Sequence, residues 1–199
     1  MKVGLRRLYL SHLTTMIKKI LIGLVAIVAI ILVVAAMQPA SFRVERSAVI
    51  AASPQALFEQ VNDHKKFEVW NPWSKMDPSS KTVYSGAASG VGAVASWVGE
   101  MTGKGSSTIT ESKPGELVRQ RMDWIEPMAG VSTVDFTFAP EGDKTKVTWA
   151  MYGENNFMGK LFSLVMDCES MCGPEFEKGL ADLAKVVTGA PAPAPTPAK

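Results

Sequence analysis

The feature that most constrains this chain is an unbroken apolar run, ILIGLVAIVAIILVVAA, at residues 20–36. It contains one glycine and no polar or charged side chain. As a helix with about 1.5 Å of rise per residue it is roughly 25 Å long, and Met37 and the aliphatic stems of Lys18 and Lys19 extend it further. A helix in the core of a soluble domain normally keeps a polar stripe, and this run has none. We therefore predict a transmembrane anchor at residues 20–37.

Basic residues on the N-terminal side of this run set its orientation. Arg6, Arg7, Lys18 and Lys19 precede it, whereas the three residues after Met37 carry no charge. The positive-inside rule then predicts a cytoplasmic segment at residues 1–19. The rest of the chain is expected outside the cytoplasm, as part of a single-pass protein of the cytoplasmic (inner) membrane.

Two alternatives to this interpretation stay open. The run could be the core of a cleaved secretory signal peptide, because Val34-Ala35-Ala36 is an acceptable small-residue cleavage site. Met16, which is followed by Ile-Lys-Lys, could be the true start. Neither alternative changes the extracytoplasmic location predicted for the domain.

The charge of the chain divides between the anchor flank and the rest. The sequence has 21 Lys and Arg and 19 Asp and Glu. Five basic residues precede the apolar run and one is the last residue, so residues 41–189 hold 15 basic and 19 acidic groups, a net charge of −4. Nucleic-acid binding needs a basic surface, so we predict no nucleic-acid partner.

Two cysteines, Cys168 and Cys172, lie four positions apart. Metal ligation needs more partners, and no other cysteine and no nearby histidine supplies them. We predict no metal site and no cofactor. The two thiols fit best as small apolar fillers on one helical face. A disulfide stays open, although two positions four apart on a regular helix reach its geometry only with local distortion.

The remaining sequence predicts one domain at residues 42–188, long enough to bury a sizeable core. Residues 189–199 are a Pro- and Ala-rich tail that contains APAPAPTP. This composition is typical of an extended, disordered tail, and we expect it to form neither helix nor sheet.

The domain begins with a predicted strand at residues 42–51. Ser53-Pro54 then predicts a helix start, with an N-cap followed by proline at the first position. A second short helix or turn is expected over residues 64–70, and Asn71-Pro72 ends it. Trp73 and Asp77 are expected in the loop that follows.

Six further segments are predicted as strands of an antiparallel meander, because short Gly-, Pro- or Asp-containing turns separate them. They are residues 81–85, 92–98, 106–112, 116–125, 131–139 and 144–152. In the last three, apolar and aromatic residues alternate with polar ones, so one face of the sheet must be covered.

The cover is expected from two helical segments at residues 157–171 and 174–187, with a break or kink at Gly173-Pro174. Their apolar stripe includes Leu161, Leu164 and Val165. The predicted fold class is α+β, with a curved antiparallel sheet of about six to seven strands wrapped around a long C-terminal helix.

Several phrases in this order resemble the START-like superfamily, also called SRPBCC, and specifically its polyketide cyclase/dehydrase-type branch. They are VIAASPQALF at 49–58, VWNPW at 69–73 with Asp77-Pro78, SWVG at 96–99, KVTWAM at 146–151 and GPEFEKGL at 173–180. The resemblance spans roughly residues 42–188. It implies a helix-grip fold with a deep, mostly apolar cavity for lipids, polyketides, sterols or other hydrophobic ligands. It implies little about catalysis, because many members only bind or carry ligands. The predicted anchor departs from the soluble domains typical of the superfamily.

The candidate ligand-binding residues lie on the covered, apolar face of the sheet (the dry face) and in the loop after residue 72. Gln120 and Ser132 are polar groups among large apolar neighbours, where an unpaired group costs about 1–3 kcal/mol. They either find a protein partner or orient a polar group of a ligand. The others are aromatic or thioether side chains that line a pocket or simply fill the core. The full set is Trp73, Trp97, Gln120, Met122, Trp124, Ser132, Phe136, Trp149 and Met151.

Catalytic and phosphate-binding patterns have simpler explanations. His64, within the polar run NDHKK, is expected at a solvated helix end. The glycines at 86, 90 and 92 precede a predicted strand and not a helix, so a hairpin loop explains them better than a phosphate cradle. No catalytic residue is predicted.

Three functions follow as hypotheses. The first is a membrane-anchored domain that binds a hydrophobic small molecule or lipid without covalent chemistry. The second is a cyclase/dehydrase-like enzyme in which a pocket carboxylate or Gln120 polarises the substrate. The third is a structural or sensory protein whose cavity is filled by side chains.

Overall fold

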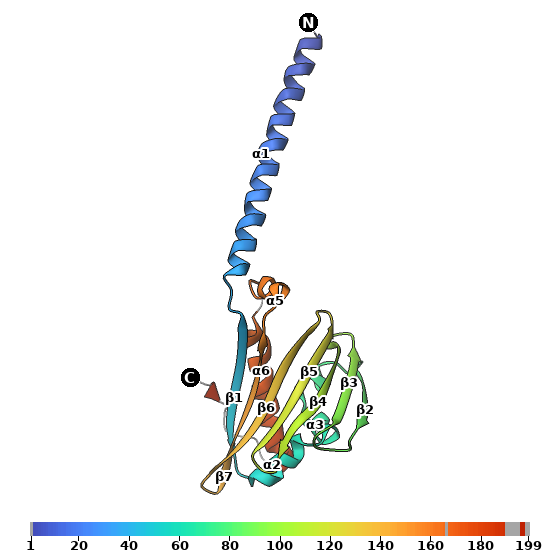
Figure 1. The fold of residues 1–199 in the computed structure, drawn as a ribbon, viewed down its shortest axis with the longest axis vertical. Coiled ribbons are helices and arrows are strands. Elements are labelled where there is room, and N and C mark those ends of the chain that lie inside the picture. Colours follow the sequence, from blue (N-terminus) through green and yellow to red (C-terminus); the bar gives the residue numbers. More distant parts are fainter. Residues whose placement is uncertain (1, 166, 190–195, 198–199) are drawn as a thin grey trace. The chain divides into compact units, whose positions relative to one another are not determined.

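The computed structural model describes residues 2–165, 167–189 and 196–197, with side chains described for residues 16–165 and 167–189. The chain forms two compact units. One unit is Met1–Ala40 with Asn155–Val165, and the other is Ser41–Glu154 with Met166–Lys199. Each unit is described by itself below, and the elements carry the labels of Figure 1.

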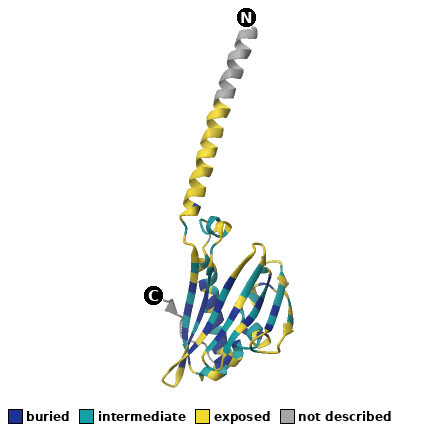
Figure 2. Cartoon of the chain, in the orientation of Figure 1, coloured by how far each residue is buried: buried dark blue, intermediate teal, exposed yellow. Residues whose placement is uncertain are grey.

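The first unit contains the long helix α1 (Lys2–Ala36) and the short helix α5 (Phe157–Phe162). Among the described side chains of α1, all are exposed except Ala35 (Figure 2). The part from Met16 to Ala36 is long and apolar enough to span a membrane, as a signal sequence near an N-terminus also would be. Leu, Ile and Val exposed on every side of a helix are unfavourable in water and favourable in lipid.

The second unit is an antiparallel sheet with helices on one face. The strands are β1 (Ser41–Ile50), β2 (Lys81–Gly86), β3 (Ala93–Gly99), β4 (Gly103–Lys113), β5 (Leu117–Glu126), β6 (Gly130–Glu141), β7 (Lys144–Glu154) and β8 (Thr196–Pro197). Their order is β2-β3-β4-β5-β6-β7-β1-β8 (Figure 1). The seven predicted strands are all present, and the α+β helix-grip prediction is confirmed.

Four helices belong to this unit: α2 (Pro54–Val61), α3 (His64–Trp70), α4 (Pro72–Met76) and α6 (Cys168–Thr188). Ser53 caps α2 through its side chain, with Pro54 at the first position, as the sequence predicts. Helix α6 packs against β1 and β7, α2 against β5 and β6, and α3 against β3. The helices therefore cover one face of the sheet unevenly.

The helical prediction after residue 156 is partly wrong. Helix α5 ends at Phe162, and α6 begins at Cys168 after the N-cap Asp167, whose side chain accepts a hydrogen bond from the Ser170 amide. Helix α6 then runs through Pro174 without the predicted break. Pro174 is the seventh residue of the helix, so it removes one internal hydrogen bond. Cys172 before it and Phe176 after it both pack against the core, and these contacts favour a continuous helix. Leu161, Leu164 and Val165 consequently lie outside the stripe of α6.

Two smaller predictions also differ from the structure. Trp73 lies in the five-residue helix α4 and not in a loop, because Asn71 ends α3 and also caps the next helix. Thr196–Pro197 forms β8, which pairs with Arg46 and Ser47 of β1, so the tail prediction is wrong for these two residues. A strand edge accepts even a short extended segment. Residues 190–195 of the predicted tail lie outside the described residues.

A candidate ligand-binding face

The helix-covered face of the sheet divides into two parts with different covers. The open part is a row of partly exposed and polar side chains on β3 to β6, and the closed part is an aromatic cluster beneath α6. The open part comprises Trp97, Ser107, Gln120, Met122, Trp124 and Ser132. The closed part comprises Phe67, Trp70, Trp73, Phe136, Trp149 and Phe176.

Three buried polar side chains form the floor of the open part: Ser107, Gln120 and Ser132. Ser107 of β4 donates a hydrogen bond from its hydroxyl to Gln120 Oε1 of β5, at 3.1 Å. Gln120 is 2% exposed, and its Nε2 has no hydrogen-bond partner among the described residues. An amide nitrogen that carries two hydrogens and makes no bond at this depth costs about 1–3 kcal/mol. The floor therefore presents an unused donor.

The two indoles of Trp97 and Trp124 and the thioether of Met122 lie on the same face of the sheet as this floor. Trp124 Nε1 donates to Ser132 Oγ at 2.9 Å, and Trp97 Nε1 donates to the Thr102 carbonyl at 3.3 Å. The two rings meet edge to face, with centroids 5.7 Å apart at 75°. Gly105 lies between them in the ladder, and a Cβ there would come within 2.5 Å of the Trp97 ring. The glycine is what allows the two indoles to meet across β4.

The closed part is filled by rings. Trp149 of β7 stacks on Phe176 of α6, with centroids 4.2 Å apart at 9°, and Phe136 lies 4.7 Å from Trp149. A Cβ on Gly179 of α6 would come within 2.6 Å of the Trp149 ring, so this glycine lets the helix approach the indole. Trp149 Nε1 is buried and has no described partner. This half is an aromatic core in which side chains occupy the interior.

The candidate residues from the sequence fall in both parts. Trp97, Gln120, Met122, Trp124 and Ser132 lie together in the open part, whereas Trp73, Phe136 and Trp149 belong to the closed cluster. Met151 is buried on β7 and pairs with Val134, which in turn pairs with Gln120, so it lies in the same row across the sheet as Gln120. Ser107 was not predicted from the sequence. Ser107 and Ile109 lie two positions apart and therefore face the same side of β4, and this period of two could have identified Ser107.

An ion-pair cluster fixes the start of α6 above the sheet. Arg46 of β1 is almost fully buried, and its guanidinium donates to Glu169 and Glu177 of α6. Both carboxylates are substantially exposed. The hydrogen bond to Glu169, together with the one to Glu177, raises the Arg46 pKa above its ordinary value despite burial. Arg46 is thereby charged at any physiological pH and ties β1 to the helix.

The two cysteines lie on the same helix, at its start. Both are free thiols and pack against the core. Burial raises the pKa of the Cys168 thiol and raises that of Cys172 to about 12. Such thiols are protonated and unreactive, which agrees with their interpretation as apolar fillers.

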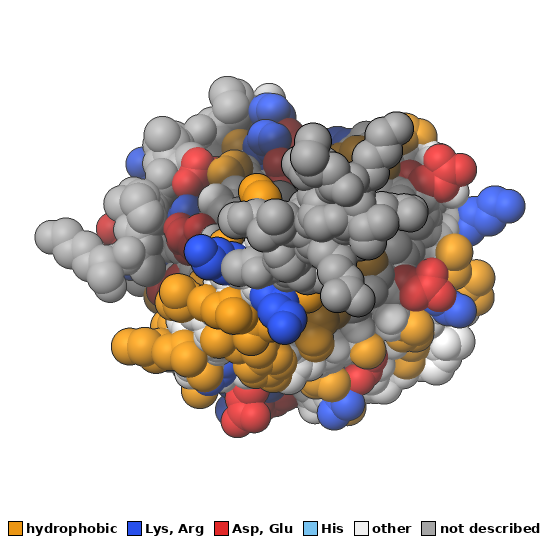
Figure 3. All heavy atoms as spheres, turned by 90° about the horizontal axis from the view of Figure 1, so that it is seen from above, with side chains coloured by type: hydrophobic (Ala, Val, Ile, Leu, Met, Phe, Trp, Pro, Cys, Tyr) orange, Lys and Arg blue, Asp and Glu red, His pale blue; other side chains and the backbone are white. Residues whose placement is uncertain are grey.

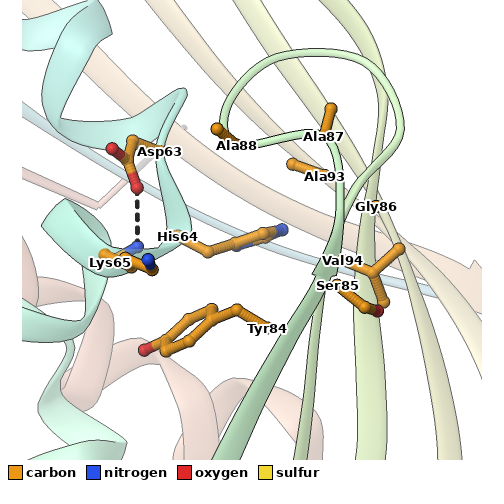
Figure 4. A pocket seen from close by; sticks show the side chains of 10 residues that line it. All are labelled: Asp63, His64, Lys65, Tyr84, Ser85, Gly86, Ala87, Ala88, Ala93 and Val94. Atoms are coloured by element: carbon orange, nitrogen blue, oxygen red, sulfur yellow. Dashed lines mark hydrogen bonds between the residues drawn. The ribbon is translucent and has the colours of Figure 1, made fainter.

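One pocket of the domain lies outside the face described above, where α3 meets the β2–β3 hairpin (Figure 4). Its volume is about 150 Å³, and His64, Lys65, Tyr84 and Gly86 are among its lining residues. His64 is only 5% exposed, and its ring extends from α3 toward the hairpin, so the prediction of a solvated helix end is wrong. Burial lowers the His64 pKa, and its Nε2 has no described partner.

A second pocket of about 400 Å³ lies beside β2 to β5, with Lys81, Val83, Val98 and Ile125 among its lining residues. Neither pocket contains any residue of the open part except Trp97. The glycine-rich segment at 86–92 is the β2–β3 hairpin connection, as predicted. Within the described ranges, no group of three His, Cys, Asp or Glu side chains is placed to hold a metal ion.

Comparison with known proteins identifies the family. Residues 41–188 match the family described as polyketide cyclase/dehydrase and lipid transport. The chain belongs to this family. The match covers the whole sheet apart from β8, all helices of the second unit, and α5. No curated protein sequence matches the chain.

Solved structures share the fold at low sequence identity. Protein CV1439 from Chromobacterium violaceum is 18% identical with a TM-score of 0.53, over 75% of this chain and 98% of that one. The Aha1 dimer from Colwellia psychrerythraea is 15% identical with a TM-score of 0.53, over 73% and 96%. Ginseng major latex-like protein 151 from Panax ginseng is 12% identical with a TM-score of 0.52, over 75% and 99%. These likenesses establish the START-like fold of this member of the family, and no more.

Proposed function

We propose that this protein binds a hydrophobic small molecule or lipid in the open part of its concave face, without covalent chemistry. Helix α1 anchors it in the cytoplasmic membrane and the domain lies on the extracytoplasmic side. The family description, which includes lipid transport, supports a ligand of this class. Tethering the domain to a bilayer raises its encounter rate with lipids, because the second binding event becomes intramolecular.

The observation that carries the proposal is the unpaired Nε2 of Gln120. It is buried on β5, where Met122 and then Trp124 follow on the same face, and its Oε1 is already engaged by Ser107. A ligand with an apolar body and one hydrogen-bond acceptor satisfies this donor while its body packs on Trp97, Met122 and Trp124. Since the Trp97–Trp124 pair stands beside the floor and both rings are partly exposed, we expect these rings to move when the ligand enters.

The chemistry of the face supports binding without catalysis. None of the six side chains of the open part is an acid or a nucleophile activated by a neighbouring base. The carboxylates of Glu169 and Glu177 on α6 are engaged by Arg46, and those of Glu175 and Asp182 are engaged by lysines.

The test is to identify what the protein carries. The full chain, purified in mild detergent and reconstituted in nanodiscs, is extracted with organic solvent and the extract is analysed by mass spectrometry. We expect one apolar compound with a hydrogen-bond acceptor, enriched over the nanodisc lipids. The Gln120→Leu variant should lose it, and the matched Trp149→Phe variant should retain it.

The closed part supports one alternative, a domain whose interior is fully occupied by side chains. Rings already fill the space beneath α6. An extract that contains only the nanodisc lipids in their bulk proportions, with no Trp fluorescence change when a fluorescent fatty acid is added, would establish this alternative and overturn the proposal.

A further inference from the structure

The segment at residues 155–165, NNFMGKLFSLV, is an apolar element on the surface of the first unit. It includes α5 and carries a single charge, Lys160. Four of its large apolar side chains are exposed to solvent: Phe157 at 49%, Met158 at 56%, Phe162 at 45% and Val165 at 87%. Single exposed apolar residues are ordinary, but four within nine positions form a patch that needs a partner.

Backbone and side-chain bonds hold this segment against the carboxyl end of α1. The β1–β7 ladder ends with Ser41 opposite Glu154. One residue further on, the Asn155 amide donates to the Ala40 carbonyl at 2.9 Å, and its side chain donates to the Pro39 carbonyl at 3.3 Å. Asn156 then caps α5 through a bond from the Gly159 amide at 2.8 Å. The chain therefore enters α5 from a position fixed beside the end of α1.

The contact between the two helices is visible in the burial of α1. Helix α5 packs against α1, and Ala35 is completely buried while the other described side chains of α1 are exposed. Ala35 is the second-last residue of α1, so α5 lies at the level where the apolar run ends. In the view from above, hydrophobic side chains gather into a patch bordered by charged ones (Figure 3).

We propose that the 155–165 segment lies in the interface of the same bilayer that α1 spans. This inference rests on the proposed anchoring role of α1. A membrane-spanning helix that ends at Ala36 brings its last turn to the bilayer surface, and α5 is held at that turn. Aromatic and thioether side chains are favourable at this depth, and Lys160 can extend its ammonium to lipid phosphates. The protein then contacts the membrane through two elements, one spanning and one interfacial.

Charge and composition favour lipid over a protein partner. The segment has no acid, and its single basic residue is flanked by apolar ones, which suits an anionic or zwitterionic surface. The segment also connects two elements of the domain along the chain. It joins β7, which carries Trp149, to α6, which carries Phe176.

The test measures membrane depth with nitroxide labels on the full chain in phosphatidylcholine and phosphatidylglycerol vesicles. Cys168 and Cys172 are replaced by Ala, and single cysteines are introduced as Phe157→Cys or Phe162→Cys. Two references are labelled in the same way: Ile27→Cys within the span and Val83→Cys on the exposed strand β2. Collision with oxygen, which concentrates in lipid, is compared with collision with a water-soluble nickel complex.

We expect labels at 157 and 162 to favour oxygen, at a depth between those of the two references. Adding Met158→Ser and Val165→Ser should shift the label at 162 toward the aqueous value, while the label at 27 stays unchanged. Labels at 157 and 162 that match Val83→Cys overturn the inference, and labels reached by neither collider mean that protein covers the segment, which also overturns it. If the label at 27 is itself aqueous, the anchoring role of α1 fails, and this outcome is distinct from the other two.

Discussion

The two parts of the concave face are built on the same strands and differ in what lies above them. Under α6, each ring of the sheet meets a ring from a helix, as Trp149 does with Phe176. Beside β3 to β5, where α6 does not pack, the rings of the sheet meet each other, as Trp97 does with Trp124. In the closed part four of the six rings are buried and Phe67 and Trp73 are partly buried, whereas in the open part all three large side chains are only partly buried.

The helices above the sheet therefore determine which part of its apolar face is packed and which part stays partly exposed. In the closed part, burial of large rings contributes stability and leaves no room for a ligand. In the open part, polar groups lie on the floor and one donor is unpaired, which reduces stability. Trp149 Nε1 of the closed part is also unpaired, but it lies within packed rings, whereas the Gln120 amide lies in a row with partly exposed side chains, and for this reason we propose the ligand site in the open part.

The largest expected effect separates the two parts by stability. Replacing Trp149 with Ala in the closed part should lower the free energy of unfolding by about 3–5 kcal/mol, since a fully packed ring is lost. The matched change Trp97→Ala in the open part should cost about 1–2 kcal/mol, because that ring is partly solvated. Urea unfolding of the full chain in detergent, followed by circular dichroism, measures both. Equal losses would mean that the two parts do not differ in cover.

The next effect concerns the ion pairs of Arg46 with Glu169 and Glu177, here called the Arg46 clamp, which tie α6 to β1. Removing both carboxylates with Glu169→Ala and Glu177→Ala leaves the buried Arg46 guanidinium without a charged partner, and we expect a loss of about 3 kcal/mol. Arg46→Met should cost only about 1 kcal/mol, because the carboxylates it frees are largely in water already. The same unfolding experiment compares the two variants. A larger loss for Arg46→Met would show that its stem packing, and not its charge, fixes α6.

A smaller effect distinguishes the two unpaired donors. Gln120→Leu should change the free energy of unfolding by about 1 kcal/mol or less, because it removes an unsatisfied amide, yet it should weaken binding of a fluorescent fatty acid about tenfold. Trp149→Phe removes the unpaired donor of the closed part and should leave that affinity unchanged. Titration of both variants in nanodiscs gives the two constants. Loss of affinity in Trp149→Phe alone would move the site to the closed part.

The smallest expected effect lies outside both parts, at His64, where α3 meets the β2–β3 hairpin. Burial lowers the His64 pKa in the folded state from its ordinary 6.5, while the carbonyl of Ala93 and the carboxylates of Asp63 and Glu68 oppose that shift. The unfolded chain thus binds a proton first as pH falls, so the stability contributed by neutral His64 is complete above pH 6.5 and is lost below it. Melting temperatures from about pH 7.5 to about pH 5 should fall less steeply in His64→Phe than in the parent. Identical slopes would mean that His64 titrates alike in both states.

Much of the fold could be predicted from local sequence. Alternation on β5, β6 and β7 identified Gln120, Ser132 and Phe136 as facing one side, and the turn residues predicted the order of β2 to β7, but not the pairing of β1 with β7. The N-cap of α2 followed from Ser53-Pro54. These features depend on neighbours two to four residues away, so the sequence carries them directly.

The errors came from long-range contacts. His64 has polar neighbours in sequence, and only the approach of the β2–β3 hairpin buries it. Gly173 and Pro174 resemble a helix break in sequence, yet α6 is continuous through them, with Cys172 and Phe176 packed against the core. Leu161 and Leu164 continue an apolar stripe in sequence, yet α5 ends at Phe162 and lies beside α1.

The sequence by itself determined the unbroken apolar character of residues 20–36, the antiparallel α+β fold and the set of residues on the apolar face of the sheet, because each depends on composition or on a period of two or four. Only the tertiary structure decided which of those residues are covered. That depends on where α6 meets the sheet, on Gly179 and Gly105 as points of close approach, and on the Arg46 clamp. The sequence already marked Gln120 as a candidate, but only the tertiary structure showed that Ser107 engages its Oε1 and that its Nε2 is left without a partner among the described residues.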